Sequence, residues 1–224
     1  NGSPPDPRAY ADSTVSDDAV TICENLLRTL FRKRAVIDCM LDAVCKRHQI
    51  RPDVLSVLRI GVTEITFLDG LEPPLVTDSC VRYVKQIRTR KEGGFVNAVL
   101  RRLVREGPRT RAAAAEERGP ENVRFGLSPA LLAQWKKHTD NAMLRSRAGL
   151  IQRPAPFVVR IRPGFTGVPE GIPGDLQPLS APAWWPRETL YTAGNPPELL
   201  RSSVFGEGQI YVQDPSTLLA PALL

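Results

Sequence analysis

The stretch from Gly93 to Leu103 constrains the fold of this chain more than any other part of the sequence. Apolar residues recur in it at three- and four-residue steps, which at about 100° per residue place them on one side of a helix. Arginines fall on the other side. The pattern predicts a packed helix whose outer face is either a solvated charged surface or a nucleic-acid surface. The apolar side carries Val96, Val99, Leu100 and Leu103, and the polar side carries Arg101, Arg102 and Arg105.

Helical signals precede this stretch at intervals of about 20 residues with short connections, a spacing typical of an all-α bundle. Asp17 and Asp18 predict a helix to Phe31, and a second apolar stripe predicts a separate helix around Val36 to Val44. Further helices are expected from Pro52 to Leu68 and from Pro73 to Ile87. In the Gly93 stretch itself, the two glycines suggest the turn from which the helix starts.

The second half of the chain has a different composition. Helices are expected at Ser128–Trp135 and Asn141–Gln152, and proline is frequent from there to Pro197, which favours strands and turns. The best strand candidates are Phe157–Ile161 and Gln209–Val212. The expected fold class is therefore mainly α, with a helical bundle followed by a smaller α/β module. The expected divisions are a flexible lead at 1–16, the bundle at 17–108, a linker at 109–122 and the module at 123–224.

Basic residues are concentrated in two parts of this 224-residue chain, which carries a formal net charge of +6. Seven basic residues and one acid lie between Lys85 and Arg105, and eight basic residues and one acid lie between Arg124 and Arg162. Such clusters suit an anionic partner.

The remaining composition argues against several classes of protein. The four cysteines (Cys23, Cys39, Cys45 and Cys80) have neither zinc-site nor disulfide spacing, and we expect buried free thiols in a reducing compartment. No run of about 18 apolar residues and no secretory signal pattern is found, so we expect a cytoplasmic protein without a membrane span. His48 and His138 are isolated, and no metal-binding or catalytic residue is predicted.

Four segments, in order, resemble one family of RNA-modifying proteins. The string GGFVNAVLRRL is similar to the motif that opens the last helix of NusB-type RNA-binding domains. Leu127–Trp135, Phe157–Arg162 and Gly208–Thr217, the last containing Val212-Gln213-Asp214, resemble segments of Sun/Fmu-type bacterial 16S rRNA cytosine-C5 methyltransferases. In that family a NusB-like domain precedes the catalytic domain, whereas free-standing NusB proteins lack the Val-Gln-Asp segment.

The resemblance implies an RNA-binding N-terminal region that positions 16S rRNA for methylation by S-adenosylmethionine. The family's catalytic cysteines and cofactor loop have no counterpart here, and Leu224 precedes the expected loop. We therefore expect no cofactor-binding residue and no activity in this chain alone, with the catalytic domain as a partner. Gln213, Asp214 and Ser216 either help to close that domain's cofactor cleft or simply start a helix.

Nine basic residues are the candidates for RNA contact. Arginine and lysine neutralise phosphates, and arginine also stacks on bases. Two alternatives remain, namely a stand-alone NusB-like antitermination factor and a helical protein-interaction domain with solvated basic faces. Arg160 either contacts RNA or braces the catalytic domain. The candidates are Lys85, Arg88, Arg101, Arg102 and Arg105, a second patch of Arg32, Lys33 and Arg34, and the strand residue Arg160.

Overall fold

The computed structural model describes residues 16–153, 155–164, 172, 176–179 and 190–218. The chain divides into two compact units, Asn1–Arg153 and Pro154–Leu224. Apart from Ser16, the lead expected at residues 1–16 lies outside the described part.

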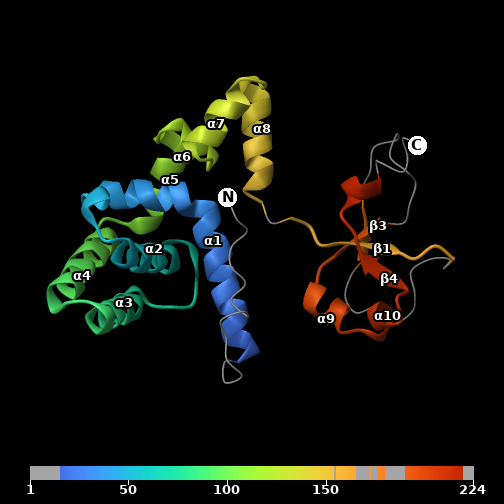
Figure 1. The fold of residues 1–224 in the computed structure, drawn as a ribbon, viewed down its shortest axis with the longest axis horizontal. Helices are drawn as coiled ribbons and strands as arrows, with labels where there is room; N and C mark the ends of the chain where they lie inside the picture. The colour runs from blue at the N-terminus through green and yellow to red at the C-terminus, as the bar shows by residue number, and fades with distance from the viewer. Residues whose placement is uncertain (1–15, 154, 165–171, 173–175, 180–189, 219–224) are drawn as a thin grey trace. The chain divides into compact units, whose positions relative to one another are not determined.

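Unit 1 is helical, as predicted (Figure 1). Four of its helices begin with proline in the first turn, where the missing N–H has no helical partner to lose. Side chains of Ser16, Ser128 and Asp140 accept hydrogen bonds from backbone N–H groups at three helix starts, and the helix that Ser128 caps is also one of the four with proline. The helices are α1 (Asp17–Asp42), α2 (Pro52–Phe67), α3 (Pro73–Ile87), α4 (Arg90–Arg105), α5 (Pro108–Arg118), α6 (Glu121–Phe125), α7 (Pro129–Lys136) and α8 (Asn141–Ile151), with a short 3-10 helix, η2 (Arg47–Gln49), between α1 and α2.

Helix α1 corrects the expectation of two separate helices in the first 45 residues. It runs without a break from Asp17 to Asp42, although Figure 1 shows that it changes direction along its length. The segment between Phe31 and Val36 contains neither proline nor glycine, so nothing in it ends the helix.

The main core of unit 1 forms where α1, α2, α3 and α4 pack together. Its fully buried side chains include Leu41, Leu58, Val84 and Leu100. Gly61 lets α2 approach its neighbours, because a Cβ atom there would lie 3.0 Å from Cys80 Sγ and 3.1 Å from Leu100 Cδ1.

The cysteines are free, but they are not all buried. Cys80 is buried, and desolvation raises the pKa of its thiol to about 11. Cys39 and Cys45 are half-buried, and burial raises the pKa of both. Cys23 is exposed on α1, so the expectation of a buried thiol is wrong at that position.

The segment expected as a linker at residues 109–122 is helical and belongs to unit 1. Ala112 of α5 and Val123 of α6 are buried in the same core as α2 and α4. Alanine has the highest helix propensity, so the run Ala112–Ala115 forms a helix and contributes one face to the core. Helices α7 and α8, expected within the second module, also fall in unit 1 and enclose a satellite core around Leu132 and Leu144.

Unit 2 has the expected α/β character. Its described strands form an antiparallel sheet in the order β2-β3-β1-β4, of which Figure 1 labels β3, β1 and β4. Val159, Ile161 and Ile210 pack on one face, and Val158 and Leu190 pack on the other. The elements are β1 (Val158–Ile161), β2 (Leu176–Pro178), β3 (Leu190–Ala193), α9 (Pro196–Leu200), α10 (Ser203–Gly206), β4 (Ile210–Val212) and the 3-10 helix η3 (Pro215–Leu218).

Substitutions at two glycines of unit 1 should change its free energy of unfolding in opposite directions. Gly94 lies in α4, and a Cβ atom added there would have no other atom within 4 Å. Gly94→Ala should therefore raise the free energy of unfolding by about 1 kcal/mol, because alanine has the higher helix propensity. Gly61→Val should lower it by roughly 1–3 kcal/mol, because the added methyl groups meet Cys80 and Leu100. Urea unfolding followed by circular dichroism measures both. Equal stability of the two variants would contradict the packing described here.

Candidate nucleic-acid interface

Helix α4 begins earlier than the glycine pair suggested. Thr89 and Glu92 form a reciprocal capping box, in which Thr89 Oγ1 accepts from the Glu92 N–H at 3.2 Å and Glu92 accepts from the Thr89 N–H. The Thr-x-x-Glu pattern could have located this start from the sequence. The expected two-sided pattern is confirmed, because the Val96 to Leu103 stripe is buried and the arginines are exposed.

Lys85 of α3 lies directly against the first turns of α4. A Cβ atom on Gly93 would lie 2.7 Å from Lys85 Cγ, so the lysine stem covers the position where any other residue would carry a side chain. The role of Gly93 is therefore a close approach between the two helices rather than a turn.

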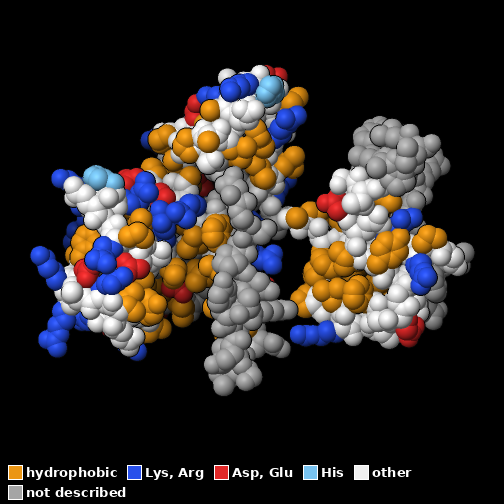
Figure 2. Space-filling view, in the orientation of Figure 1, with side chains coloured by type: hydrophobic (Ala, Val, Ile, Leu, Met, Phe, Trp, Pro, Cys, Tyr) orange, Lys and Arg blue, Asp and Glu red, His pale blue; other side chains and the backbone are white. Residues whose placement is uncertain are grey.

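A groove between α3 and α4, the α3–α4 groove, brings together three of the predicted RNA-binding residues. Lys85, Arg101 and Arg105 line it, together with Asn97, and its volume is about 470 Å³. All three cations are exposed, and none has an ion pair among the described residues. The acid in the lining, Asp78, is paired with Arg82 at 2.7 Å. Figure 2 shows Lys and Arg side chains projecting from the edge of unit 1 that α4 occupies.

Arg102 and Arg88 do not line the groove, and both form ion pairs with acids. Arg102 Nε lies 2.8 Å from Glu106 Oε1, and Arg102 Nη1 donates to the Val44 carbonyl at 3.3 Å. Arg88 pairs with Asp53 of α2, and this hydrogen bond holds the pKa of the Asp53 carboxyl below its usual value. Both guanidinium groups stabilise the junction of helices as well as contributing positive charge.

The second predicted patch does not join the groove. Lys33 pairs with Glu116 of α5 at 2.7 Å and lies 5.8 Å from the Phe67 ring centroid, and Arg34 pairs with Asp38 at 3.2 Å. Arg32 is half-buried on α1.

Arg160 lies in unit 2, where it contacts the segment that resembles the methyltransferase family. Its guanidinium lies 5.7 Å from the Tyr211 ring centroid and donates to Gln213 Oε1 at 3.4 Å. Asp214 Oδ1 accepts from the Ser216 hydroxyl at 2.7 Å and from the Ser216 N–H at 2.8 Å, and these two bonds, the hydroxyl bond first, lower the pKa of Asp214. The N–H contact is the geometry expected of a helix start. The structure therefore shows local roles for these residues within unit 2.

A second hollow beside α4, the η2 pocket, was missed by the sequence analysis. Its volume is about 350 Å³, and Phe95, 37% exposed, contributes an aromatic ring to its apolar lining. Its cations come from two separate parts of the chain, one before α2 and one in α4. A count of charges within the single segment from Lys85 to Arg105 therefore could not reveal the pocket. The one sequence signal was an aromatic residue placed off the apolar stripe of α4. The lining residues are Lys46, Gln49, Ile50, Arg51, Val54, Lys91, Glu92 and Phe95.

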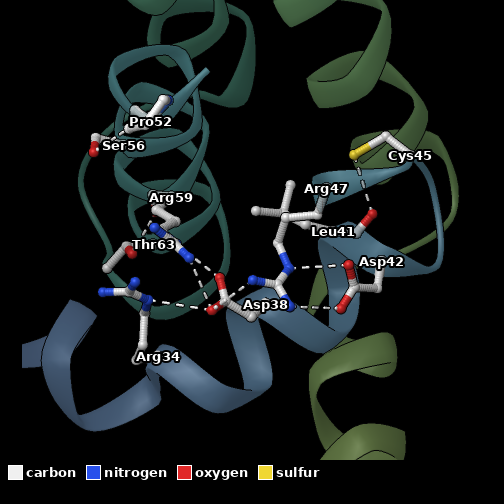
Figure 3. A network of polar contacts seen from close by, with 10 residues as sticks. All are labelled: Arg34, Asp38, Leu41, Asp42, Cys45, Arg47, Pro52, Ser56, Arg59 and Thr63. Atoms are coloured by element: carbon white, nitrogen blue, oxygen red, sulfur yellow. Dashed lines mark hydrogen bonds and ion pairs between the residues drawn. The ribbon is translucent and has the colours of Figure 1, made fainter. Parts of the chain in front are cut away.

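An ionic network fixes the segment that forms one wall of this pocket (Figure 3). Asp38 of α1 accepts from Arg59 of α2 at 2.7 and 2.9 Å, and from Arg34 at 3.2 Å. Arg47 of η2 reaches Asp38 at 3.3 Å and Asp42 at 2.9 Å. Arg47 directly follows Lys46 in the chain, so the network ties the pocket wall to both α1 and α2.

Metal-ligating side chains do not gather at one point in the part of the chain that is described. Within it, no group of three or more His, Cys, Asp or Glu side chains is placed to hold a metal ion. Helices long and apolar enough to cross a membrane are likewise lacking among these residues.

Residues 5–105 match the NusB family. This NusB domain covers α1 to α4, and so it contains both the α3–α4 groove and the η2 pocket. The chain is also similar in fold to the crystal structure of PH0851, with a TM-score of 0.58 and 13% sequence identity over 94% of this chain and 48% of that chain. The likeness is one of fold alone, and the chain spans about half the length of PH0851.

Removing Arg88 from the NusB domain should change the titration of Asp53. We expect Arg88→Gln to raise the pKa of the Asp53 carboxyl towards its ordinary value, because the Arg88 hydrogen bond is the largest cause of its depression. The stabilisation from this pair is present above the unfolded-state pKa of Asp53 and is lost as the pH falls through the folded-state pKa. Carboxyl NMR titration measures the change, with Arg82→Gln as the control, since Arg82 pairs with Asp78 instead. An unchanged Asp53 titration in Arg88→Gln would contradict the assignment.

Asp38→Asn should destabilise the domain more than the same change at an exposed ion pair. Arg59, with a side chain only 11% exposed, would lose its carboxylate partner, and we expect a loss of about 2 kcal/mol in the free energy of unfolding. Asp78→Asn is the matched control, because both members of the Asp78–Arg82 pair are about two-thirds exposed and such pairs contribute about 0–1 kcal/mol. If urea unfolding gives equal losses of unfolding free energy for the two variants, the Asp38 network stabilises the domain no more than an exposed ion pair does.

Proposed function

We propose that the NusB domain of this chain binds RNA through the faces flanking α4. The observation that carries the proposal is the gathering of Lys85, Arg101 and Arg105 around one groove, with none of the three in an ion pair among the described residues. The match of residues 5–105 to the NusB family supports it independently. Cations left unpaired in the folded protein keep their charge available for phosphates, whose neutralisation releases counterions.

The η2 pocket complements the groove, because it offers a different kind of contact. The Phe95 ring provides a surface on which an unstacked base can lie, and Lys46 and Lys91 stand at the same pocket for the adjoining phosphates. A double helix keeps its bases stacked inside, so this pocket favours a single-stranded or looped RNA. The α3–α4 groove has no aromatic side chain in its lining and suits the sugar-phosphate backbone.

We further propose that this RNA is 16S rRNA and that the chain serves a cytosine-C5 methyltransferase. The support is the ordered resemblance of four segments, including Val212-Gln213-Asp214, to that family. In this proposal S-adenosylmethionine and the catalytic cysteines belong to a catalytic domain outside residues 1–224, and the protein acts in the cytoplasm. A stand-alone antitermination factor is the alternative, which the NusB match supports equally and the segments after residue 105 favour less.

The double variant Lys85→Gln and Arg101→Gln tests the groove by removing two positive charges without adding negative ones. For a labelled single-stranded RNA of about twelve nucleotides, we expect affinity to fall roughly tenfold at moderate salt, because two phosphate contacts are lost. The slope of log affinity against log salt should become shallower by about 1.4. Fluorescence anisotropy at several salt concentrations measures both quantities.

The matched control is Arg28→Gln and Arg118→Gln, which removes the same charge from exposed positions on α1 and α5. Its affinity and salt slope should stay close to those of the unmodified chain. The proposed function fails if the chain binds no RNA, or if the groove variant and the control weaken binding equally.

A further inference from the structure

We propose that one RNA strand passes over the outer face of α4, with one end in the η2 pocket and the other in the α3–α4 groove. This inference rests on the RNA binding proposed above and adds the route of the strand. It makes the two hollows parts of a single site rather than two independent ones.

The positions around α4 place the two hollows on opposite flanks of the helix. Lys91 and Phe95 line the η2 pocket, whereas Asn97 and Arg101 line the groove. At about 100° per residue, the centres of these two pairs lie about 120° apart around the axis, and the buried stripe lies on the far side. The arc between them therefore faces outward.

Two of the residues on this outward arc, Gly94 and Ala98, have small side chains, whereas Arg105 lies on the same arc nearer the end of the helix. A Cβ atom added at Gly94 would have no other atom within 4 Å, and Ala98, one turn further along, is exposed. A strand crossing at this level meets helix backbone and a methyl group, so its phosphates can approach the basic side chains on either side. A helix is about 10 Å across, and so a crossing takes about three nucleotides at the 3.4 Å spacing of a stacked strand.

The charges on α4 suit a polyanion along the whole crossing. Five of its residues are basic, and the only acid within the helix is Glu92. Glu92 belongs to the lining of the η2 pocket, but its carboxylate accepts hydrogen bonds from Thr89 at the helix start and does not lie on the outer face. Glu106, which follows the helix, is engaged by Arg102 and Arg111. The basic residues are Arg90, Lys91, Arg101, Arg102 and Arg105.

The first test places a negative charge on the crossing point. Ala98→Glu should weaken binding of the twelve-nucleotide RNA roughly tenfold, because the new carboxylate faces the phosphates. Alanine and glutamate are both good helix formers, so α4 should stay folded. Ala113→Glu is the matched control, since Ala113 is exposed on α5 and the substitution adds the same charge away from the route. Its effect should stay below about twofold.

The second test follows the two ends of the strand. An RNA of about six nucleotides carrying a nitroxide at its 5′ end should broaden the amide NMR signals around one hollow more strongly than those around the other, and a 3′ nitroxide should reverse the order. The residues to follow are Phe95 for the η2 pocket and Arg101 for the groove.

The outcomes separate this inference from the proposed function. If the chain binds RNA and the Lys85→Gln, Arg101→Gln variant weakens binding, the proposed function stands. If Ala98→Glu then matches Ala113→Glu, or both nitroxides broaden the same hollow more strongly, the single crossing strand is overturned. If the chain binds no RNA, both proposals fail together.

Discussion

The packing of the α4 stripe against α2 and α3 determines where every basic group of the candidate site lies. Val96, Leu100 and Leu103 are fully or almost fully buried, so the helix has one rotational setting about its axis. That setting turns the α4 arginines outward. The close approaches at Gly61 and Gly93 allow the same packing, because each glycine leaves room for a neighbouring side chain. The polar surface is in this sense a consequence of the apolar one.

The sequence predicted the elements whose signals are local. The α4 stripe, the proline starts of α2, α3 and α7, and strands β1 and β4 all follow from spacing and composition within a few residues. The predicted division of α1 into two helices was wrong, because a shift of the apolar residues to another face does not require the helix to end. The linker at 109–122 was misplaced because an alanine-rich helix of mixed charge does not reveal whether one of its faces is buried.

The candidate site was less predictable, since it depends on partners distant in the sequence. Lys85 and Arg88 look equivalent in the chain, yet one rests on Gly93 and the other pairs with Asp53, 35 residues away. Lys33 is likewise taken by Glu116, 83 residues away. Counting charges along the chain cannot tell paired from unpaired cations, and it cannot assemble the η2 pocket from two separate segments.

The contact between Lys85 and Gly93 bears on the entropy of binding. A long lysine side chain normally loses rotamer freedom when it meets a ligand, and ordering such a side chain costs about 0.5–1.5 kcal/mol. Here the stem is already ordered by a backbone surface that carries no opposing charge. Part of the entropy cost of ordering Lys85 is therefore met when the protein folds rather than when RNA binds. The ammonium group reaches the groove with its positive charge not neutralised by an acid.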